Sequence, residues 1–91
     1  MQTMTDRLKS IATEVTDEYI IVGDFLELDL FQVWAIEDNK IDYCGDIWEA
    51  ASNHPNGKGW CAATRGGQVQ HFSTNEAKMM AIHWLLICKR I

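Results

Sequence analysis

The chain has 91 residues, which favours one domain spanning residues 1–91, and an apolar content of 47% excludes an intrinsically disordered chain. The net charge is −5, which works against contact with phosphates, and three cysteines, an odd number, do not indicate a disulfide framework. No run of 18 apolar residues occurs, and residues 1–10 lack the apolar core of a signal peptide. We therefore expect a cytoplasmic protein with no membrane partner.

Apolar residues in the first part of the chain recur at the spacing of a helix, at positions 4, 8, 11 and 15. This spacing predicts a short amphipathic helix from about Thr5 to Val15. Residues Tyr19 to Val22 are β-branched or aromatic and predict a strand, which Gly23 and Asp24 end.

The middle of the chain predicts further strands. Leucines at positions 26, 28 and 30 alternate with Glu27 and Asp29, which is the pattern of a strand with one buried face. From Phe31 to Ile36 the alternation is lost, so either both faces are buried there or a bulge changes the register. Residues 41–44 predict the returning strand, which Gly45 ends. Residues 46–51 form either a short helix or a last strand segment, and residues 52–58 form a loop.

The last third of the chain predicts a β-hairpin that leads into a long helix. Residues 60–64 and 68–72 are the two strands, and Gly66 and Gly67 supply the positive φ that a tight turn needs. Ser73 and Glu76 have the spacing of a capping box, which predicts the start of a helix. One apolar stripe runs along this helix at the helical period: Ala77, Met80, Ala81, Trp84, Leu85 and Cys88.

The C-terminal helix has a second, narrower apolar row formed by Met79, Ile82 and Leu86. Because the two rows cover more than half of its circumference, the helix is either covered on two sides or meets a partner. The second alternative motivates the hypothesis of a homodimer.

These elements together predict an α+β fold. It consists of a short N-terminal helix, an antiparallel sheet of about four to five strands, and a C-terminal helix packed on the sheet. The expected core is Leu28, Leu30, Val33, Trp34, Ile36, Ile41, Trp60, Val69, Phe72, Ala77, Ala81, Trp84 and Leu85.

Cysteines and histidines are the residues that would carry metal or nucleophile chemistry. They lack the two- to five-residue ligand spacing of structural zinc sites, although Cys61 and His71 come close across the hairpin on several registers. No cysteine occupies the electropositive setting that a catalytic thiol needs, and Cys44 lies among acids. The carboxylate pair Glu37 and Asp38 is more typical of a solvated surface than of a general acid and base. We therefore expect no enzymatic activity, no metal and no cofactor.

A hairpin followed by a helix, with Lys58, Arg65 and Lys78 nearby, is similar to part of the double-stranded-RNA-binding domains. However, the final helix opens with Asn75 and Glu76, whereas that family has a lysine-rich start. Direct nucleic-acid binding is therefore not expected. A small nucleic-acid-binding or regulatory protein that uses the basic C-terminal part is the alternative function.

Acidic residues are concentrated in the middle of the chain. Residues 16–50 contain ten acids and one base, a net charge of −9, whereas residues 51–91 contain one acid and five bases. The acids of this segment can form a solvated surface that keeps the protein soluble. Alternatively, their charge can attract a basic protein partner, and exposed aromatic residues, including Phe25, can then supply the buried contacts with that partner. On the second interpretation the expected partner-binding residues are Asp24, Glu27, Asp29, Glu37, Asp38, Asp42, Tyr43, Asp46, Trp48 and Glu49.

In size and in this acidic segment, the chain resembles two groups of small proteins. These are the phage-encoded anti-CRISPR inhibitors, many of which occupy nucleic-acid-binding surfaces of Cas complexes, and the bacterial immunity proteins that neutralise nuclease toxins. The resemblance implies stoichiometric inhibition of a nuclease or another nucleic-acid-handling complex. For a phage-encoded chain it also implies location in the bacterial host cytoplasm.

Overall fold

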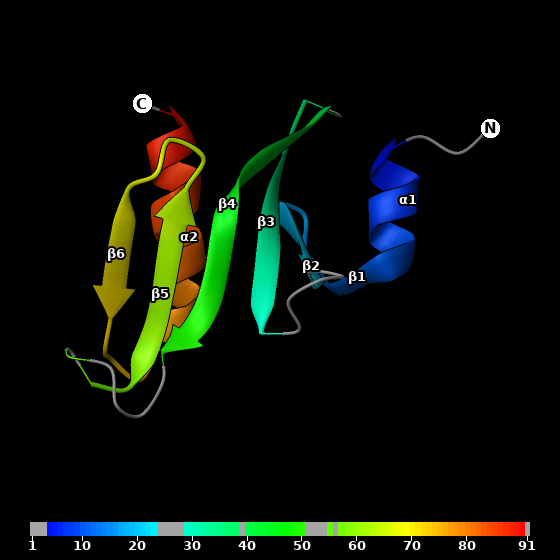
Figure 1. The fold of residues 1–91 in the computed structure, drawn as a ribbon. Coiled ribbons are helices and arrows are strands. Elements are labelled where there is room, and N and C mark those ends of the chain that lie inside the picture. The colour runs from blue at the N-terminus through cyan, green and yellow to red at the C-terminus, as the bar shows by residue number, and fades with distance from the viewer. Residues whose placement is uncertain (1–3, 24–28, 39, 51–54, 56, 91) are drawn as a thin grey trace.

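The protein folds into one antiparallel sheet of six strands and two helices, shown by a computed structural model that describes residues 4–23, 29–38, 40–50, 55 and 57–90 (Figure 1). The strands follow one another in the sheet in chain order, from β1 to β6. The elements are α1 (Met4–Ile11), β1 (Ala12–Val15), β2 (Tyr19–Gly23), β3 (Leu30–Glu37), β4 (Lys40–Ala50), β5 (Gly59–Thr64), β6 (Val69–Phe72) and α2 (Ala77–Arg90). The predicted α+β class is confirmed, with six strands where four or five were expected.

Helix α1 is shorter than predicted. It ends at Ile11, and Ala12–Val15 forms strand β1, which pairs with β2. The hydroxyl of Thr13 adds a hydrogen bond of 3.2 Å to the carbonyl oxygen of Ile21. The predicted helix through Val15 is wrong because pairing with a neighbouring strand outweighs a weak helical pattern.

Helix α2 covers one face of the sheet, mainly over β4 and β5, as Figure 1 shows. Five of its residues are buried against the strands: Ala77, Ala81, Ile82, Leu85 and Leu86. The main core on the strand side includes Tyr19, Ile21, Val33, Cys44, Ile47 and Ala62. Packing of α2 on the sheet is therefore as predicted.

The face of α2 that meets the sheet includes Ala77, Ala81 and Leu85 of the predicted stripe but is turned away from Met80. Ile82 and Leu86 are buried, whereas Met80, expected in the core, is 41% exposed. The row of Met79, Ile82 and Leu86 is thus part of the main core at two of its three positions, so it does not form a free surface for a homodimer. Val69, also expected in the core, is 61% exposed, and Leu28 lies outside the described residues.

Helix α1 covers the opposite face of the sheet at its β1–β2 end. Leu8 packs with Ile20 and Val22 in a second, smaller core, and Trp34 and Ile36 flank it partly buried. Neither helix covers this second face over β4, β5 and β6. The described helices are also too short and polar to cross a membrane.

Strand β4 continues through Gly45, where the sequence predicted a strand end. Val33 pairs with Gly45 but Trp34 pairs with Tyr43, so Cys44 is an extra residue in a β-bulge. Gly45 has φ +151°, and a Cβ atom there would overlap the carbonyl oxygen of Ala63. Glycine is therefore required inside the strand, and of the two alternatives for residues 46–51 the strand is correct as far as Ala50.

The predicted hairpin is confirmed by β5 and β6. Thr64 fixes the turn, because its amide donates to the carbonyl oxygen of Gln68 at 2.8 Å and its hydroxyl accepts from the amide of Gln68 at 3.0 Å. Gly67 has the positive φ, at +96°. Helix α2 begins at Ala77, and the first helical hydrogen bond runs from the amide of Met80 to the carbonyl of Glu76. Glu76 is thus the N-cap, in place of the expected Ser73.

Candidate functional site

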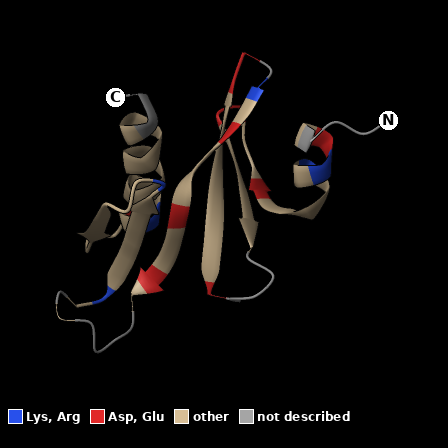
Figure 2. Ribbon diagram, turned by 45° about the horizontal axis from the view of Figure 1, so that its top comes forward, with Lys and Arg blue, Asp and Glu red and all other residues tan. Residues whose placement is uncertain are grey.

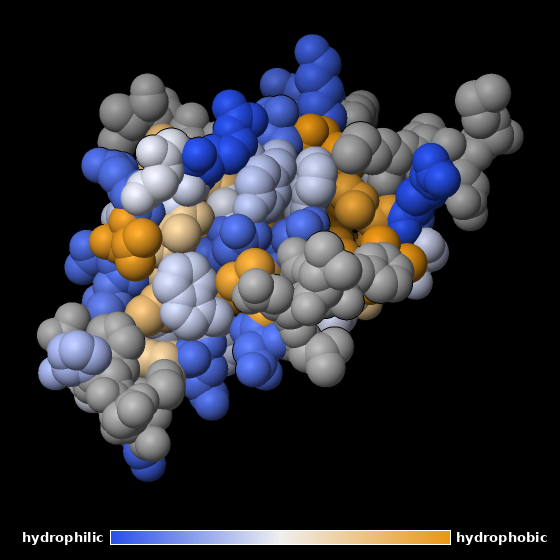
Figure 3. Space-filling model, viewed as in Figure 1, coloured by the Kyte–Doolittle hydropathy of each residue, from blue (hydrophilic) through white to orange (hydrophobic). Residues whose placement is uncertain are grey.

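The side of the sheet that neither helix covers over β4 to β6 presents three rows of side chains across neighbouring strands. We call this side the open face. Strand pairing and alternation place ten residues on it: Leu30, Trp48, Cys61 and His71 in one row; Gln32, Asp46, Ala63 and Val69 in the next; and Trp34 and Tyr43 in the third. Figure 3 views this side, where pale and blue residues mix with separate orange ones, so it is not one continuous hydrophobic patch.

Four residues of the open face form a ring of neighbours, in which three links are side-chain contacts and the fourth is a strand pairing. The indole of Trp34 donates a hydrogen bond of 3.2 Å to Oε1 of Gln32, and its ring centroid lies 5.4 Å from that of Tyr43. The hydroxyl of Tyr43 donates a 2.6 Å hydrogen bond to Oδ1 of Asp46. Asp46 is the cross-strand partner of Gln32, which closes the ring. Each side chain is thus held by a neighbour before any ligand arrives.

The bulge at Cys44 makes this ring possible. Residues three apart in a regular strand point to opposite faces, because side chains alternate. The extra residue in β4 places Tyr43 and Asp46 on the same face and turns Cys44 into the core under α2. The bulge therefore positions the carboxylate beside the aromatic pair.

Asp46 and Trp48 remain available for contact with another molecule. Within the described ranges, no donor besides Tyr43 reaches the Asp46 carboxylate, and no buried side-chain oxygen lacks a partner. Oδ2 of Asp46 is therefore not fully buried. Trp48, two residues further along β4, is half-buried. Among the described residues of β3 to β6, Asp46 is the one Asp, Glu, Lys or Arg that pairing directs to the open face.

Cys61 and His71 are cross-strand partners at the far side of the open face. Cys61 is 2% exposed, and this burial raises the pKa of its thiol. Nε2 of His71 lies 3.1 Å from the carbonyl oxygen of Gly57. A buried neutral thiol is a poor nucleophile. In the part of the chain that the structure describes, no three metal-ligating side chains come together.

The expected partner-binding residues are distributed over several places, as Figure 2 shows for the acids. Tyr43, Asp46 and Trp48 share the open face. The others lie at the ends of strands or on the opposite side, or fall outside the described residues. Glu37 and Asp38 form the β3–β4 turn, Asp42 pairs with Ala35, Asp29 precedes β3, Glu49 pairs with Trp60 on the α2 side, and Asp24, Phe25 and Glu27 are not described.

A groove of about 730 Å³ lies on the other side of the sheet, at the start of α2. Glu14, Glu49 and Trp60 line it together with Lys78. The ammonium of Lys78 is 3.8 Å from Oε2 of Glu14 and 5.5 Å from the centroid of the Trp60 ring. Lys78 is thus one of the residues that line this groove, and Glu49 is separated from the open face.

Sequence reasoning missed Gln32 and assigned Trp34 to the core. A polar residue inside the apolar run from Leu30 to Ile36 is the signal that could have placed Gln32 on a solvent face. The indole nitrogen of Trp34 needs a hydrogen-bond acceptor, and Gln32, two residues earlier on the same face, supplies it.

Comparisons with protein-family models, with curated protein sequences and with solved structures find no match to this chain.

Proposed function

We propose that this chain is a non-enzymatic, protein-binding inhibitor that occupies a basic, nucleic-acid-binding surface of a partner through its open face. The partner is a nuclease or another nucleic-acid-handling complex. This is the class of activity of the anti-CRISPR inhibitors and the nuclease immunity proteins, which the chain resembles in size and acidity.

The observation that carries the proposal is the hydrogen bond between Tyr43 and Asp46 on an uncovered sheet face. It holds one carboxylate in place beside the aromatic pair of Tyr43 and Trp34, with Trp48 on its other side. Tryptophan and tyrosine supply most of the binding energy at many protein interfaces. Side chains held in position before binding lose less entropy when the complex forms.

The remaining acids support a long-range role. Glu37 and Asp38 are exposed at one end of the sheet, and Asp29 is exposed at the other. Exposed charges of one sign raise the rate at which an oppositely charged partner arrives, but add little to the affinity of the final contact. We assign them to steering, and the open face to the contact itself.

The positions of the basic residues favour this proposal over direct binding of nucleic acid. Lys58 and Arg65 flank the two ends of β5, so six residues of strand separate them by about 20 Å. Lys78 is paired with Glu14 beside Trp60. Lys58 lines the same groove as Lys78, but three acids line it as well: Glu14, Glu49 and Glu76. A basic patch on one face, which phosphate binding requires, is therefore not formed by these three basic residues.

The proposal is tested by capture of the partner followed by competition. The chain is used as bait in nuclease-treated bacterial lysate at low salt, captured proteins are identified by mass spectrometry, and the partner is purified. Binding of labelled nucleic acid to that partner is then measured with increasing amounts of the chain. We expect stoichiometric displacement of the nucleic acid.

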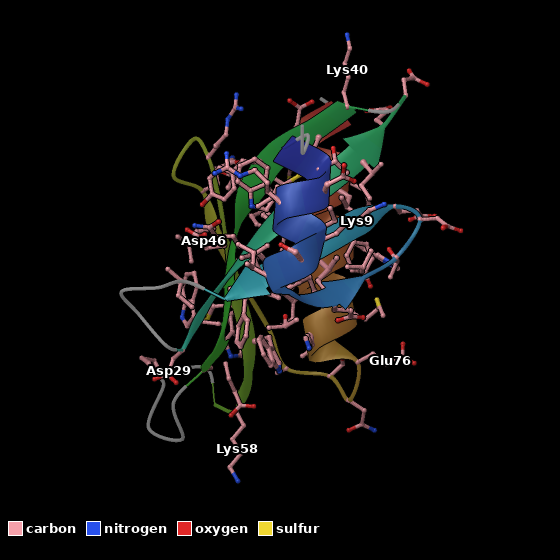
Figure 4. All side chains as sticks on the ribbon, turned by 90° about the vertical axis from the view of Figure 1, so that its right-hand side faces the viewer. Lys9, Asp29, Lys40, Asp46, Lys58 and Glu76 are labelled. Carbon is pink, nitrogen blue, oxygen red and sulfur yellow. The ribbon has the colours of Figure 1, made fainter. Side chains whose placement is uncertain are left out.

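Two variants with the same change of charge provide the comparison. Asp46→Asn removes a charge from the open face, whereas Glu76→Gln removes one at the start of α2, on the opposite side of the sheet (Figure 4). Glu76→Gln should displace nucleic acid as the parent does, and Asp46→Asn should need a higher concentration. A captured partner that keeps its nucleic acid at saturating inhibitor would refute the proposed function.

A further inference from the structure

We infer that the open face receives an arginine side chain of the partner, with its guanidinium hydrogen-bonded to Asp46 and stacked on Trp48. This inference rests on the proposed function and adds to it the chemical group that is recognised. It follows from the contact that holds Asp46 and from the place of Trp48 on the same face of β4.

Asp46 is an oriented acceptor for a cation. Tyr43 donates to Oδ1 at 2.6 Å, and this bond fixes the carboxylate, while Oδ2 is not fully buried. A carboxylate with one oxygen that accepts from no described donor is a common acceptor for the N–H donors of an arginine. Because one oxygen is already held, fewer rotamers are lost when the second oxygen accepts a hydrogen bond.

Trp48 lies at the distance that a guanidinium bound to Asp46 would reach. The two residues are on the same face of β4, two positions apart, which is about 7 Å along a strand. A guanidinium is attracted to the face of an indole ring within about 6 Å of its centre. Trp48 is half-buried, and no ring among the described residues stacks on it.

The next strand leaves room for the aliphatic part of the arginine. Ala63 is the cross-strand neighbour of Asp46 and carries only a methyl group. Beyond it on β6 lies Val69, which is 61% exposed. Arginine side chains commonly bury their methylene groups along apolar surface while the charged group binds elsewhere. The row of Asp46, Ala63 and Val69 offers this arrangement.

These contacts distinguish arginine from lysine. A guanidinium is planar, carries several donors in fixed directions and is weakly hydrated, so it can bond to the carboxylate and stack on the indole together. An ammonium is compact and strongly hydrated, and it would use the carboxylate alone. We therefore expect the open face to prefer an arginine over a lysine of equal charge.

The test uses two capped glycine peptides, one with two arginines and one with two lysines, titrated into ¹⁵N-labelled protein. The indole N–H signals of the four tryptophans are followed by NMR, and Trp48→Phe assigns the signal of Trp48. We expect saturable shifts at Trp48, with the arginine peptide binding about threefold or more tightly than the lysine peptide.

Variants separate the two contacts. Asp46→Asn should weaken binding of the arginine peptide about tenfold, whereas Glu76→Gln should leave it within about twofold. Trp48→Leu should remove the preference for arginine while keeping part of the affinity. The spectra of the variants themselves report whether the sheet is intact.

Equal affinity for both peptides, or equal effects of Asp46→Asn and Glu76→Gln, would overturn the arginine inference. Either result is independent of the proposed function, which depends on displacement of nucleic acid from a captured partner. If the chain displaces nucleic acid from the partner but does not prefer the arginine peptide, the proposed function stands and the arginine inference fails. If the chain prefers the arginine peptide but displaces no nucleic acid, the arginine inference stands and the proposed function fails.

Discussion

The hydroxyl of Tyr43 donates a 2.6 Å hydrogen bond to Oδ1 of Asp46, three residues further along the same strand. In a regular strand these two side chains would point to opposite faces. The bulge at Cys44 places both on the uncovered side of the sheet. The geometry of the candidate interface therefore depends on one irregularity of the backbone.

Replacement of Gly45 by alanine should destabilise the fold strongly. A Cβ atom would meet the carbonyl oxygen of Ala63 and the side chain of Leu85, and the φ of +151° is unfavourable for alanine. We expect a loss of about 3 kcal/mol or more in the free energy of unfolding, measured by urea denaturation. Gly23→Ala is the matched control, because nothing lies within 4 Å of its Cβ position. Equal stability of the two variants would contradict the role of Gly45.

The orientation of α2 predicts which of its apolar residues stabilise the fold. Ile82→Ala should cost about 2 to 5 kcal/mol, because Ile82 is 1% exposed in the main core. Met80→Ala should cost less than about 1 kcal/mol, because Met80 is 41% exposed. Thermal or urea unfolding of both variants measures this difference. The reverse order would mean that α2 is turned so that Met80, and not Ile82, faces the sheet.

Stability should fall in alkaline solution through Tyr19. Burial raises the pKa of its hydroxyl above 10.0, and the nearby carboxylates of Glu14 and Glu18 raise it further. The folded state then binds this proton more tightly than the unfolded state does. The contribution of this proton to the free energy of unfolding is fully present below pH 10. It is lost as the pH rises from about 10 through the pKa of Tyr19 in the folded state.

Urea unfolding at pH 8 and at pH 11 measures this loss. Tyr19→Phe should show a smaller decrease between the two pH values than the parent, since it has no hydroxyl to ionise. An identical decrease in both proteins would contradict the assignment to Tyr19.

Affinity for the partner should weaken steeply with salt. Charges on an exposed surface are screened over about 10 Å at 0.1 M ionic strength and over about 3 Å at 1 M. The association rate should fall more than the dissociation rate rises, because the exposed acids act on the approach of the partner. Surface plasmon resonance at several salt concentrations separates the two rates. Binding that is indifferent to salt would point to an apolar contact instead.

Local patterns in the sequence were sufficient for the hairpin of β5 and β6, since Thr64 to Gln68 specify the turn without help from distant residues. They were also sufficient for the α+β class. They did not determine how α2 is turned on the sheet, because Met80 and Ile82 belong to two apolar rows that together cover more than half of the helix. That choice depends on the shape of the sheet that the helix covers.

Two other features depend on contacts between distant residues. The end of α1 at Ile11 depends on the pairing of Ala12–Val15 with β2, although the helical spacing continues to Val15. Gly45 has the usual appearance of a strand end, and its role in a bulge depends on the closeness of Ala63 in the next strand. The open face could therefore be recognised only in part, through Tyr43, Asp46 and Trp48.

The most direct test of the open face as the interface is the dissociation constant of the captured partner for Asp46→Asn and for Glu76→Gln. Both variants remove one negative charge, and their positions lie on opposite sides of the sheet (Figure 4). We expect Asp46→Asn to bind about tenfold more weakly than the parent, and Glu76→Gln to remain within about twofold. Equal dissociation constants for the two variants would contradict the assignment of the open face.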